Sequence, residues 1–262
     1  MLSIKDIKPL LIVFTPRDFP LAKNWLMNIT YIDKLFICYY KTDDAHRIAR
    51  EFVEDKDYTH IIIATDDILA TPIHPMYLID DVIKYDFPVI SGWCNYNFTR
   101  DWSAITLSKP WYVARGMKII SAGQYGFTPM SSMVTYPYSK IKKGNIEYNG
   151  VKLPWYIIKV WFNGNPLTMI RRDIWDKVPF RPYSQSVDRF GRRGAMYDLQ
   201  FAIDLDKHNI PHYTDLRCFL LHFGNTVKYL KLKSCKPKTV FIKAKTPLRY
   251  AYGIWKKTFS II

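Results

Sequence analysis

The first ninety residues alternate between short apolar runs and amphipathic segments, and this alternation allows few folds. The run Leu10–Phe14 is apolar at every position, which is typical of a strand that is buried on both faces. Three further runs of strand length follow: Leu35–Tyr40, His60–Ala64 and Phe87–Ser91. We expect each of the four to form a strand.

Segments between these runs show helical periodicity. Apolar residues recur on one helix face at Ala45, Ile48, Ala49, Phe52 and Val53, and again at Leu78, Ile79, Val82 and Ile83. Strands that alternate with helices favour right-handed crossovers and a mostly parallel sheet with helices on both faces. The predicted fold class is therefore α/β. Ligands of such sheets lie beyond the carboxyl ends of the strands.

The pattern changes after residue 92. Residues 93–161 are aromatic and punctuated by Gly and Pro, which predicts loops and short strands with a hairpin near Lys143–Asn145 and Asn149–Gly150. Helices are expected over Arg171–Lys177 and Tyr197–His208. We divide the chain into an α/β half (1–92), a second half of the same domain (93–225), and a basic, aromatic C-terminal extension (226–262).

Charge is concentrated at the C-terminal end. Of 38 basic residues, ten lie between Phe223 and Ile262, where there is no Asp or Glu, so the rest of the chain has 28 basic against 23 acidic residues. A hydrophobic content of 48% excludes a disordered chain. The four widely spaced cysteines and the short apolar run Pro9–Phe14 favour a cytoplasmic protein without a signal peptide or membrane span.

The basic tail is expected to contain a helix that begins after Thr246–Pro247. One stripe of this helix is apolar and carries Leu248, Tyr252, Trp255 and Phe259. Such a helix can lie peripherally on an anionic membrane surface, or it can pack on the body with its lysines in water. Basic residues interleaved with aromatic ones can also hold nucleic acid, but the body contains no recognisable nucleic-acid-binding module.

Two adjacent carboxylates, Asp66 and Asp67, follow the apolar third strand. Burying such charges is costly unless a cation or hydrogen bonds compensate. Carboxylate oxygens suit Mg²⁺ or Mn²⁺, with substrate phosphates completing the coordination shell. Capping of the following turn is the structural alternative.

Three blocks of the chain resemble the GT-A fold glycosyltransferases, which use nucleotide sugars. The run Tyr58–Ile68 resembles the strand and metal-binding D-x-D segment, although Thr65 stands at its first acidic position. The stretch Asn163–Trp175 resembles the turn, strand and helix start that precede the acceptor-side acid. Tyr197–Phe223 resembles the acidic helix start, the next strand and the metal-binding histidine. The blocks occur in family order between Leu10 and Phe223.

The resemblance implies a GT-A-like, Rossmann-type sheet with a smaller mixed sheet on the acceptor side. It would make residues 1–92 the nucleotide-binding half and residues 93–225 the acceptor-binding and catalytic half of one domain. It also implies roles for particular residues. Asp198 would be the base that deprotonates the acceptor hydroxyl in an inverting reaction, and Asp67 and His222 would hold Mn²⁺ or Mg²⁺. The residues implied for the nucleotide-sugar donor are Thr15, Pro16, Arg17, Asp43, Asp44, Asp66 and Gly164.

Alternatives remain for several of these residues. Asp198 can be a plain helix cap, and the dipole of the helix start favours its ionised form, which would make it a weak base. His222 stands between Leu221 and Phe223, where a packed histidine is common. Trp93 and Asn95 are candidates for binding a glycan, lipid or protein acceptor, although core packing explains most tryptophans.

Two other functions remain open. A nucleotidyltransferase also uses carboxylates and a divalent ion on phosphates, but the segment Thr15–Pro20 contains no glycine-rich phosphate loop. A non-catalytic protein that binds nucleic acid is suggested by the net charge of +15. The position of the charge in the tail makes nucleic acid the less favoured partner.

Overall fold

A computed structural model gives the structure of the 262-residue chain. It describes residues 2–15, 20–94, 105–107, 109, 119–120, 146–183, 186–187, 196–223 and 236–259. Among these residues no helix combines the length and the apolar composition needed to cross a membrane.

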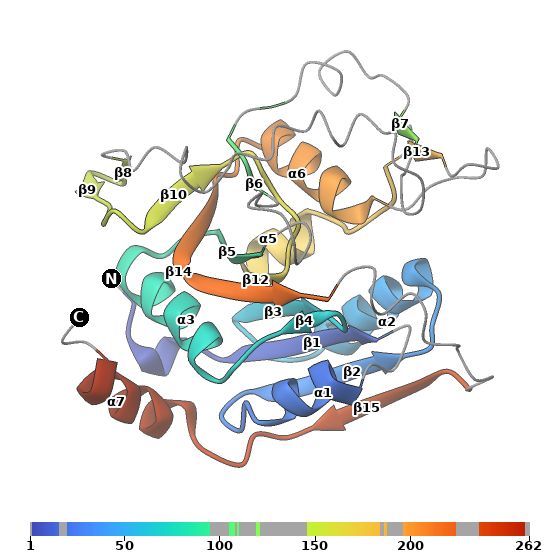
Figure 1. Cartoon of the computed structure of the whole chain (residues 1–262), viewed down its shortest axis with the longest axis horizontal. Coiled ribbons are helices and arrows are strands. Elements are labelled where there is room, and N and C mark those ends of the chain that lie inside the picture. The colour runs from blue at the N-terminus through green and yellow to red at the C-terminus, as the bar shows by residue number, and fades with distance from the viewer. Residues whose placement is uncertain are drawn as a thin grey trace.

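A large mixed sheet forms the centre of the molecule (Figure 1). Its strands follow the spatial order β10-β14-β5-β12-β3-β1-β2-β15, and β4 pairs with one end of β14. Their bounds are β1 Pro9–Thr15, β2 Asp33–Cys38, β3 His60–Thr65, β4 Ile68–Leu69, β5 Val89–Cys94, β10 Ile157–Val160, β12 Leu167–Arg171, β14 His212–His222 and β15 Lys238–Ile242.

Five of the main strands run in one direction. β1 is parallel to β2 and β3, and β14 is parallel to β5. β12 lies antiparallel between β3 and β5, so β5 and β14 share the direction of β1. Among the eight strands of this order in the described part of the chain, only β10, β12 and β15 run in the opposite direction. The predicted α/β fold class with a mostly parallel sheet is confirmed.

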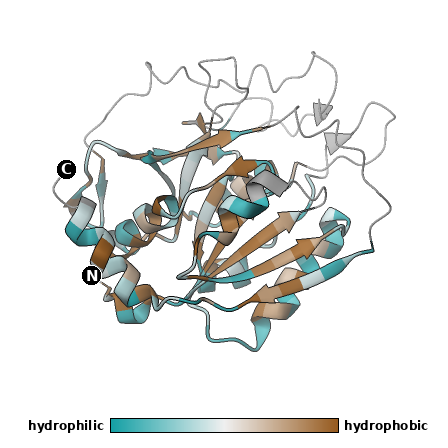
Figure 2. Ribbon diagram, turned by 60° about the horizontal axis from the view of Figure 1, so that its bottom comes forward, coloured by the Kyte–Doolittle hydropathy of each residue, from teal (hydrophilic) through white to brown (hydrophobic). Residues whose placement is uncertain are grey.

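Helices cover both faces of this sheet, as the alternation of runs predicts (Figure 1). Leu11 and Val13 of β1 belong to a core cluster with α1, α3 and α7, whereas Leu10 and Ile12 belong to one with α2, α5 and α6. The apolar colour of the central strands in Figure 2 marks the buried layer. The helices are α1 Pro20–Met27, α2 Thr42–Glu54, α3 Ile73–Tyr85, α5 Arg172–Lys177, α6 Tyr197–Lys207 and α7 Leu248–Phe259, and a short 3₁₀ helix, η1, spans Ile4–Asp6.

Short strand pairs flank the large sheet. The expected hairpin at Asn149–Gly150 joins β8 (Glu147–Tyr148) to β9 (Val151–Lys152). Both turn residues have a positive φ, 51° and 75°, which a tight two-residue hairpin turn requires. The other pairs join β11 (Phe162–Asn163) to β6 (Ile105–Thr106) and β13 (Ser186–Val187) to β7 (Ile119–Ile120). The part of the hairpin expected at Lys143–Asn145 lies outside the described residues.

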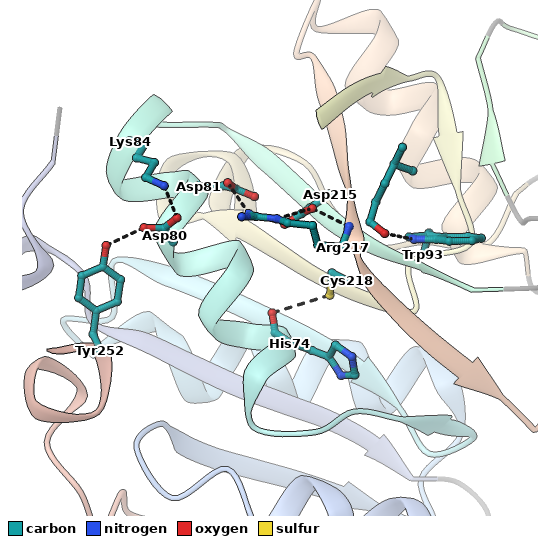
Figure 3. Close-up of polar contacts among 10 residues, drawn as sticks. His74, Asp80, Asp81, Lys84, Trp93, Asp215, Arg217, Cys218 and Tyr252 are labelled. Atoms are coloured by element: carbon teal, nitrogen blue, oxygen red, sulfur yellow. Dashed lines mark hydrogen bonds and ion pairs between the residues drawn. The ribbon is translucent and has the colours of Figure 1, made fainter. Parts of the chain in front are cut away.

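The C-terminal tail packs on the body. β15 adds an antiparallel strand next to β2, and α7 lies against α3 and η1. Tyr252 and Trp255 are 7% and 8% exposed, and the Tyr252 hydroxyl donates to Asp80 at 2.8 Å (Figure 3). Of the arrangements expected for the tail helix, packing on the body is therefore the one observed for Tyr252 and Trp255 of the apolar stripe. The basic residues Arg249, Lys256 and Lys257 are exposed.

A buried ion cluster lies beneath α3. Asp81 and Asp215 have no exposed surface, and Arg217 of β14 forms an ion pair with each, at 3.0 and 2.8 Å (Figure 3). The guanidinium also lies over the rings of Tyr77 and Tyr156. Burial and the neighbouring Asp215 carboxylate raise the pKa of Asp81. Arg217 thus neutralises charge that the core could not otherwise hold.

Candidate functional site

A cavity of about 310 Å³ opens at the carboxyl ends of β1, β2 and β3. Parallel strands end together at this edge, so side chains from distant segments meet there. The cavity wall comes from β1, α2, the segment after β3, the turn before β12 and the start of α6. Five residues predicted for the site line it: Thr15, Asp66, Asp67, Gly164 and Asp198.

Asp67 is adjacent to His222. Its Oδ2 atom lies 3.3 Å from His222 Nε2, and its Oδ1 atom accepts a hydrogen bond of 2.7 Å from the Thr65 hydroxyl. The two residues meet because β4 pairs with β14, which places His222 opposite Ile68. The Phe223 amide also donates to the Asp67 carbonyl. Thr65, at the first acidic position of the expected motif, orients the Asp67 carboxylate.

The donor set of Asp67 and His222 fits a divalent cation that substrate phosphates and water also coordinate. Within the described ranges there is no group of three or more His, Cys, Asp or Glu side chains that could hold a metal ion alone. Mg²⁺ and Mn²⁺ need no such cage, because they commonly take one or two protein ligands and bind phosphate oxygens. Among the described lining residues there is no Lys or Arg, so a bound diphosphate would need a cation beside the three acids.

Asp198 lies in the first turn of α6, on the cavity wall. Its Oδ1 atom accepts a hydrogen bond of 2.9 Å from the Leu199 amide. Burial raises the pKa of Asp198 to about 6, because the loss of hydration outweighs the amide hydrogen bonds that favour the ionised form. This corrects the weak base expected from the helix start alone. A carboxylate with a pKa near neutrality is a stronger base and is still mostly ionised at pH 7.

Other predicted residues lie elsewhere. Asp43 accepts a hydrogen bond from the Tyr197 hydroxyl, and Asp44 pairs with Arg47 on the surface of α2; neither is among the described lining residues. Trp93 is buried, its indole donates to the Leu216 carbonyl at 2.8 Å, and it packs on Phe219, so the core-packing alternative describes it (Figure 3). Three of the predicted residues lie outside the described residues: Pro16, Arg17 and Asn95.

His46 and Asn165 line the cavity but carry no signal in the sequence. The His46 ring lies in an aromatic cluster, stacked on Phe180 at 5.1 Å and on Tyr197 at 5.0 Å. Burial lowers the pKa of His46 to about 4, so the ring is neutral at pH 7. Sequence periodicity places His46 beside the apolar face of α2, but it cannot reveal a cavity to which residues more than a hundred positions away also contribute.

Three buried polar atoms at this cavity lack a hydrogen-bond partner in the described part of the chain. They are Thr15 Oγ1, His46 Nδ1 and Asn165 Nδ2. Buried polar groups are normally paired, because each unpaired group costs about 1–3 kcal/mol. These three belong to residues that line one cavity, so a polar ligand bound there is one source of the missing partners.

A larger cavity, of about 740 Å³, lies away from the acidic residues. It is lined by the β8–β9 hairpin, β10, the end of α6 and the start of β14. None of the predicted catalytic, donor-binding or metal-binding residues lines it. We therefore take the smaller cavity as the candidate site, because the acids collect there.

Comparisons with known proteins add little. No protein-family model and no curated protein matches the sequence. One similar structure is that of A197 from STIV, with a TM-score of 0.43 and 12% identity over 80% of this chain and 82% of the other. Another is the inositol-1-phosphate CTP transferase from T. maritima, with a TM-score of 0.40 and 6% identity over 87% and 93%. At these scores neither likeness bears on the chemistry of this chain.

Proposed function

We propose that this protein is a metal-dependent transferase that moves a sugar from a nucleoside-diphosphate sugar to an acceptor hydroxyl with inversion. The observation that carries the proposal is that Asp67, beside His222, and Asp198 lie on the wall of one cavity at the carboxyl edge of the sheet. Glycosyl transfer requires both parts of this arrangement, a cation on the leaving group and a base at the acceptor.

Asp67 and His222 would hold Mn²⁺ or Mg²⁺. When bound, this ion would neutralise the charge that builds up on the leaving diphosphate. Thr65 keeps the Asp67 carboxylate oriented through its hydrogen bond to Oδ1, which leaves Oδ2 toward His222. Asp66, buried on the same wall, adds negative charge that favours a cation there.

Asp198 would take the proton from the acceptor hydroxyl. With a pKa of about 6 it is mostly ionised at pH 7 and binds a proton more readily than an ordinary carboxylate. The acceptor would be a hydroxyl of a glycan, a lipid or a protein. Phe14, Ile37 and Phe180 give the cavity an apolar wall on which a nucleoside base can pack.

A screen of thermal stability tests binding. We expect nucleoside diphosphates and nucleotide sugars to raise the melting temperature in the presence of Mn²⁺, and not in the presence of EDTA. Asp67→Asn should lose this effect, whereas Asp44→Asn, a surface carboxylate on α2, should keep it. No stabilisation of the native protein by any member of the panel would reject the proposal.

Product analysis separates the proposal from the nucleotidyltransferase alternative. Sugar transfer releases a nucleoside diphosphate, whereas nucleotidyl transfer from a nucleoside triphosphate releases pyrophosphate. We expect the first product in incubations with nucleotide sugars and glycan or lipid acceptors. Release of pyrophosphate alone would favour the alternative.

A further inference from the structure

A chain of buried hydrogen bonds crosses the sheet and ends at the candidate cavity. Its members are His212 on β14, Ser91 on β5, Thr168 on β12 and Asn165 in the turn before β12. His212 Nε2 lies 2.6 Å from Ser91 Oγ, which lies 2.9 Å from Thr168 Oγ1. Thr168 Oγ1 lies 3.4 Å from Asn165 Oδ1. All four side chains are at most 5% exposed.

Asn165 gives this chain a direction. A carbonyl oxygen only accepts, so the Thr168 hydroxyl donates its hydrogen to Asn165 Oδ1. Thr168 then accepts from the Ser91 hydroxyl, and Ser91 accepts from His212 Nε2. Burial lowers the pKa of His212 to about 3, so the ring is neutral and carries one N–H. The chain assigns that proton to Nε2.

The same chain fixes the amide of Asn165. Because Oδ1 is held by Thr168, the other end of the amide, the Nδ2 group, is left with two hydrogens to donate. Nδ2 is buried, has no partner among the described residues, and belongs to a residue that lines the cavity. The backbone of Asn165 has a φ of 49°, in the left-handed region that Asn tolerates better than most residues.

Asn163, two residues earlier, provides the contrast. Its Nδ2 donates to the Gly92 carbonyl at 2.7 Å and to the Thr214 hydroxyl at 2.8 Å. Both of its amide hydrogens therefore serve the interior of the sheet. Asn163 ends β11 and Asn165 lies in the turn that follows; both are buried, but of the two only Asn165 has its donor group unused.

We propose that Asn165 is a positioning and specificity residue that donates from Nδ2 to an oxygen of the bound nucleotide sugar. Thr168, Ser91 and His212 hold the amide with its donor end available. This inference rests on the proposed function. The oxygen belongs either to the diphosphate or to a hydroxyl of the transferred sugar, which have the same hydrogen-bonding chemistry.

Isothermal titration of two variants in Mn²⁺ tests the proposal. Asn165→Asp keeps the shape and the acceptor for Thr168 but loses the donor, and Asn165→Ala loses the side chain. We expect both to raise the Kd of a ligand that the native protein binds by about 10–100-fold. The melting temperature without ligand should fall in both variants, because Ala is less favoured than Asn at a φ of 49° and Asp buries a charge, so binding is measured at a temperature at which both are folded. Asn163→Ala should lower that melting temperature too.

The ligands distinguish the two sources of the oxygen. If the Asn165 variants lose the same affinity for a nucleoside diphosphate and for its nucleotide sugar, the contact is to the diphosphate or the nucleoside. If they lose affinity for the nucleotide sugar alone, the contact is to the sugar. Unchanged Kd values in both variants would overturn the inference and leave the proposed function standing. If the native protein binds neither ligand, the proposed function fails and this inference fails with it.

The direction of the chain can be measured without a ligand. Nitrogen NMR of the imidazole should find His212 with its proton on Nε2. A proton on Nδ1 would make His212 Nε2 an acceptor and would reverse the donor and acceptor roles in the series of hydrogen bonds. Asn165 would then donate to Thr168 and turn its carbonyl oxygen, not Nδ2, toward the ligand, which would overturn the inference. Thr168→Val removes the hydrogen bond that holds Oδ1, and it should weaken ligand binding less than Asn165→Ala because the amide can still turn its donor end to the ligand.

Discussion

The Oδ2 atom of Asp67 lies 3.3 Å from Nε2 of His222, although most of the chain separates the two residues in sequence. The antiparallel pairing of β4 with β14 brings them together. Because a carboxylate and an imidazole both ligate divalent ions, this contact is where the proposed cation would bind, with Asp67 on the wall of the cavity.

Removal of either member of this pair should abolish metal-dependent binding. We expect Asp67→Asn and His222→Ala to lose the stabilisation by Mn²⁺ and a nucleoside diphosphate, about 2.7 kcal/mol when ligand is at a hundred times its Kd. Thermal melts with and without EDTA measure this. If both variants respond to Mn²⁺ as the native protein does, the cation lies elsewhere.

Asp198→Asn should eliminate sugar transfer and retain binding of the nucleotide sugar, because an amide cannot accept the proton. In the native protein the rate should follow ionisation of the carboxyl. With a pKa of about 6, kcat/KM should be level above pH 7 and fall tenfold for each pH unit well below 6. A pH series of initial rates checks this. Native turnover by the variant would refute the role of Asp198 as base.

The same substitution should stabilise the fold at neutral pH. The Asp198 carboxyl binds its proton more tightly in the folded protein, at a pKa of about 6, than unfolded, near 3.8. The contribution of this carboxyl to the stability of the native protein therefore falls as the pH rises from about 4 to about 6. Relative to native, Asp198→Asn should gain up to about 3 kcal/mol at pH 7 and little at pH 4. Urea unfolding of both proteins at pH 7 and pH 4 measures this difference. An equal difference in the free energy of unfolding at the two pH values would contradict the prediction.

Arg217 should be essential for stability. Arg217→Leu leaves Asp81 and Asp215 buried without their cation, and we expect a loss of about 3–5 kcal/mol in the free energy of unfolding. Arg47→Leu is the matched control, because its ion pairs with Asp44 and Glu51 are exposed and should be worth less than about 1 kcal/mol. Urea unfolding measures both free energies. Similar decreases in the two variants would show that the buried ion pairs of Arg217 stabilise the fold no more than the exposed pairs of Arg47.

Contact of the tail with an anionic membrane stays a prediction, and the structure changes its expected mechanism. Tyr252 and Trp255 are buried against the body, so attraction should come from exposed charges such as Arg249 and Lys257. Replacing both with Glu should weaken binding to anionic vesicles, and added salt should do the same to the native protein. Sedimentation with vesicles tests this; salt-independent binding would instead indicate insertion of apolar side chains.

The helices and strands of this protein follow from local pattern. Val13 and Ile63 lie in the consecutive apolar residues Leu10–Phe14 and Ile61–Ala64, and such runs form strands covered on both faces. The face shared by Ala45, Ala49 and Val53 fixes the helix that follows β2. The reversed direction of β12 was not predictable, because it depends on which strands it lies between and not on its own residues.

The order of motifs along the sequence pointed to Thr15, Asp67, Asp198 and His222, residues whose types and positions carry the resemblance. His46 and Asn165 were missed, because the one is an ordinary member of a helix and the other an ordinary turn residue until tertiary packing buries their polar atoms. The pKa of Asp198 likewise depends on desolvation by distant residues, which outweighs the effect of its own helix.

The sequence alone therefore determined the alternation of elements and the edge of the sheet where acids collect, since periodicity and strand ends are local properties of a chain. Only the tertiary structure decided that Asp67 meets His222, that the tail packs on the body, and that Asn165 keeps an unused donor. Those outcomes depend on burial and on contacts between distant segments. Both exist only in the folded chain, so local sequence pattern cannot predict them.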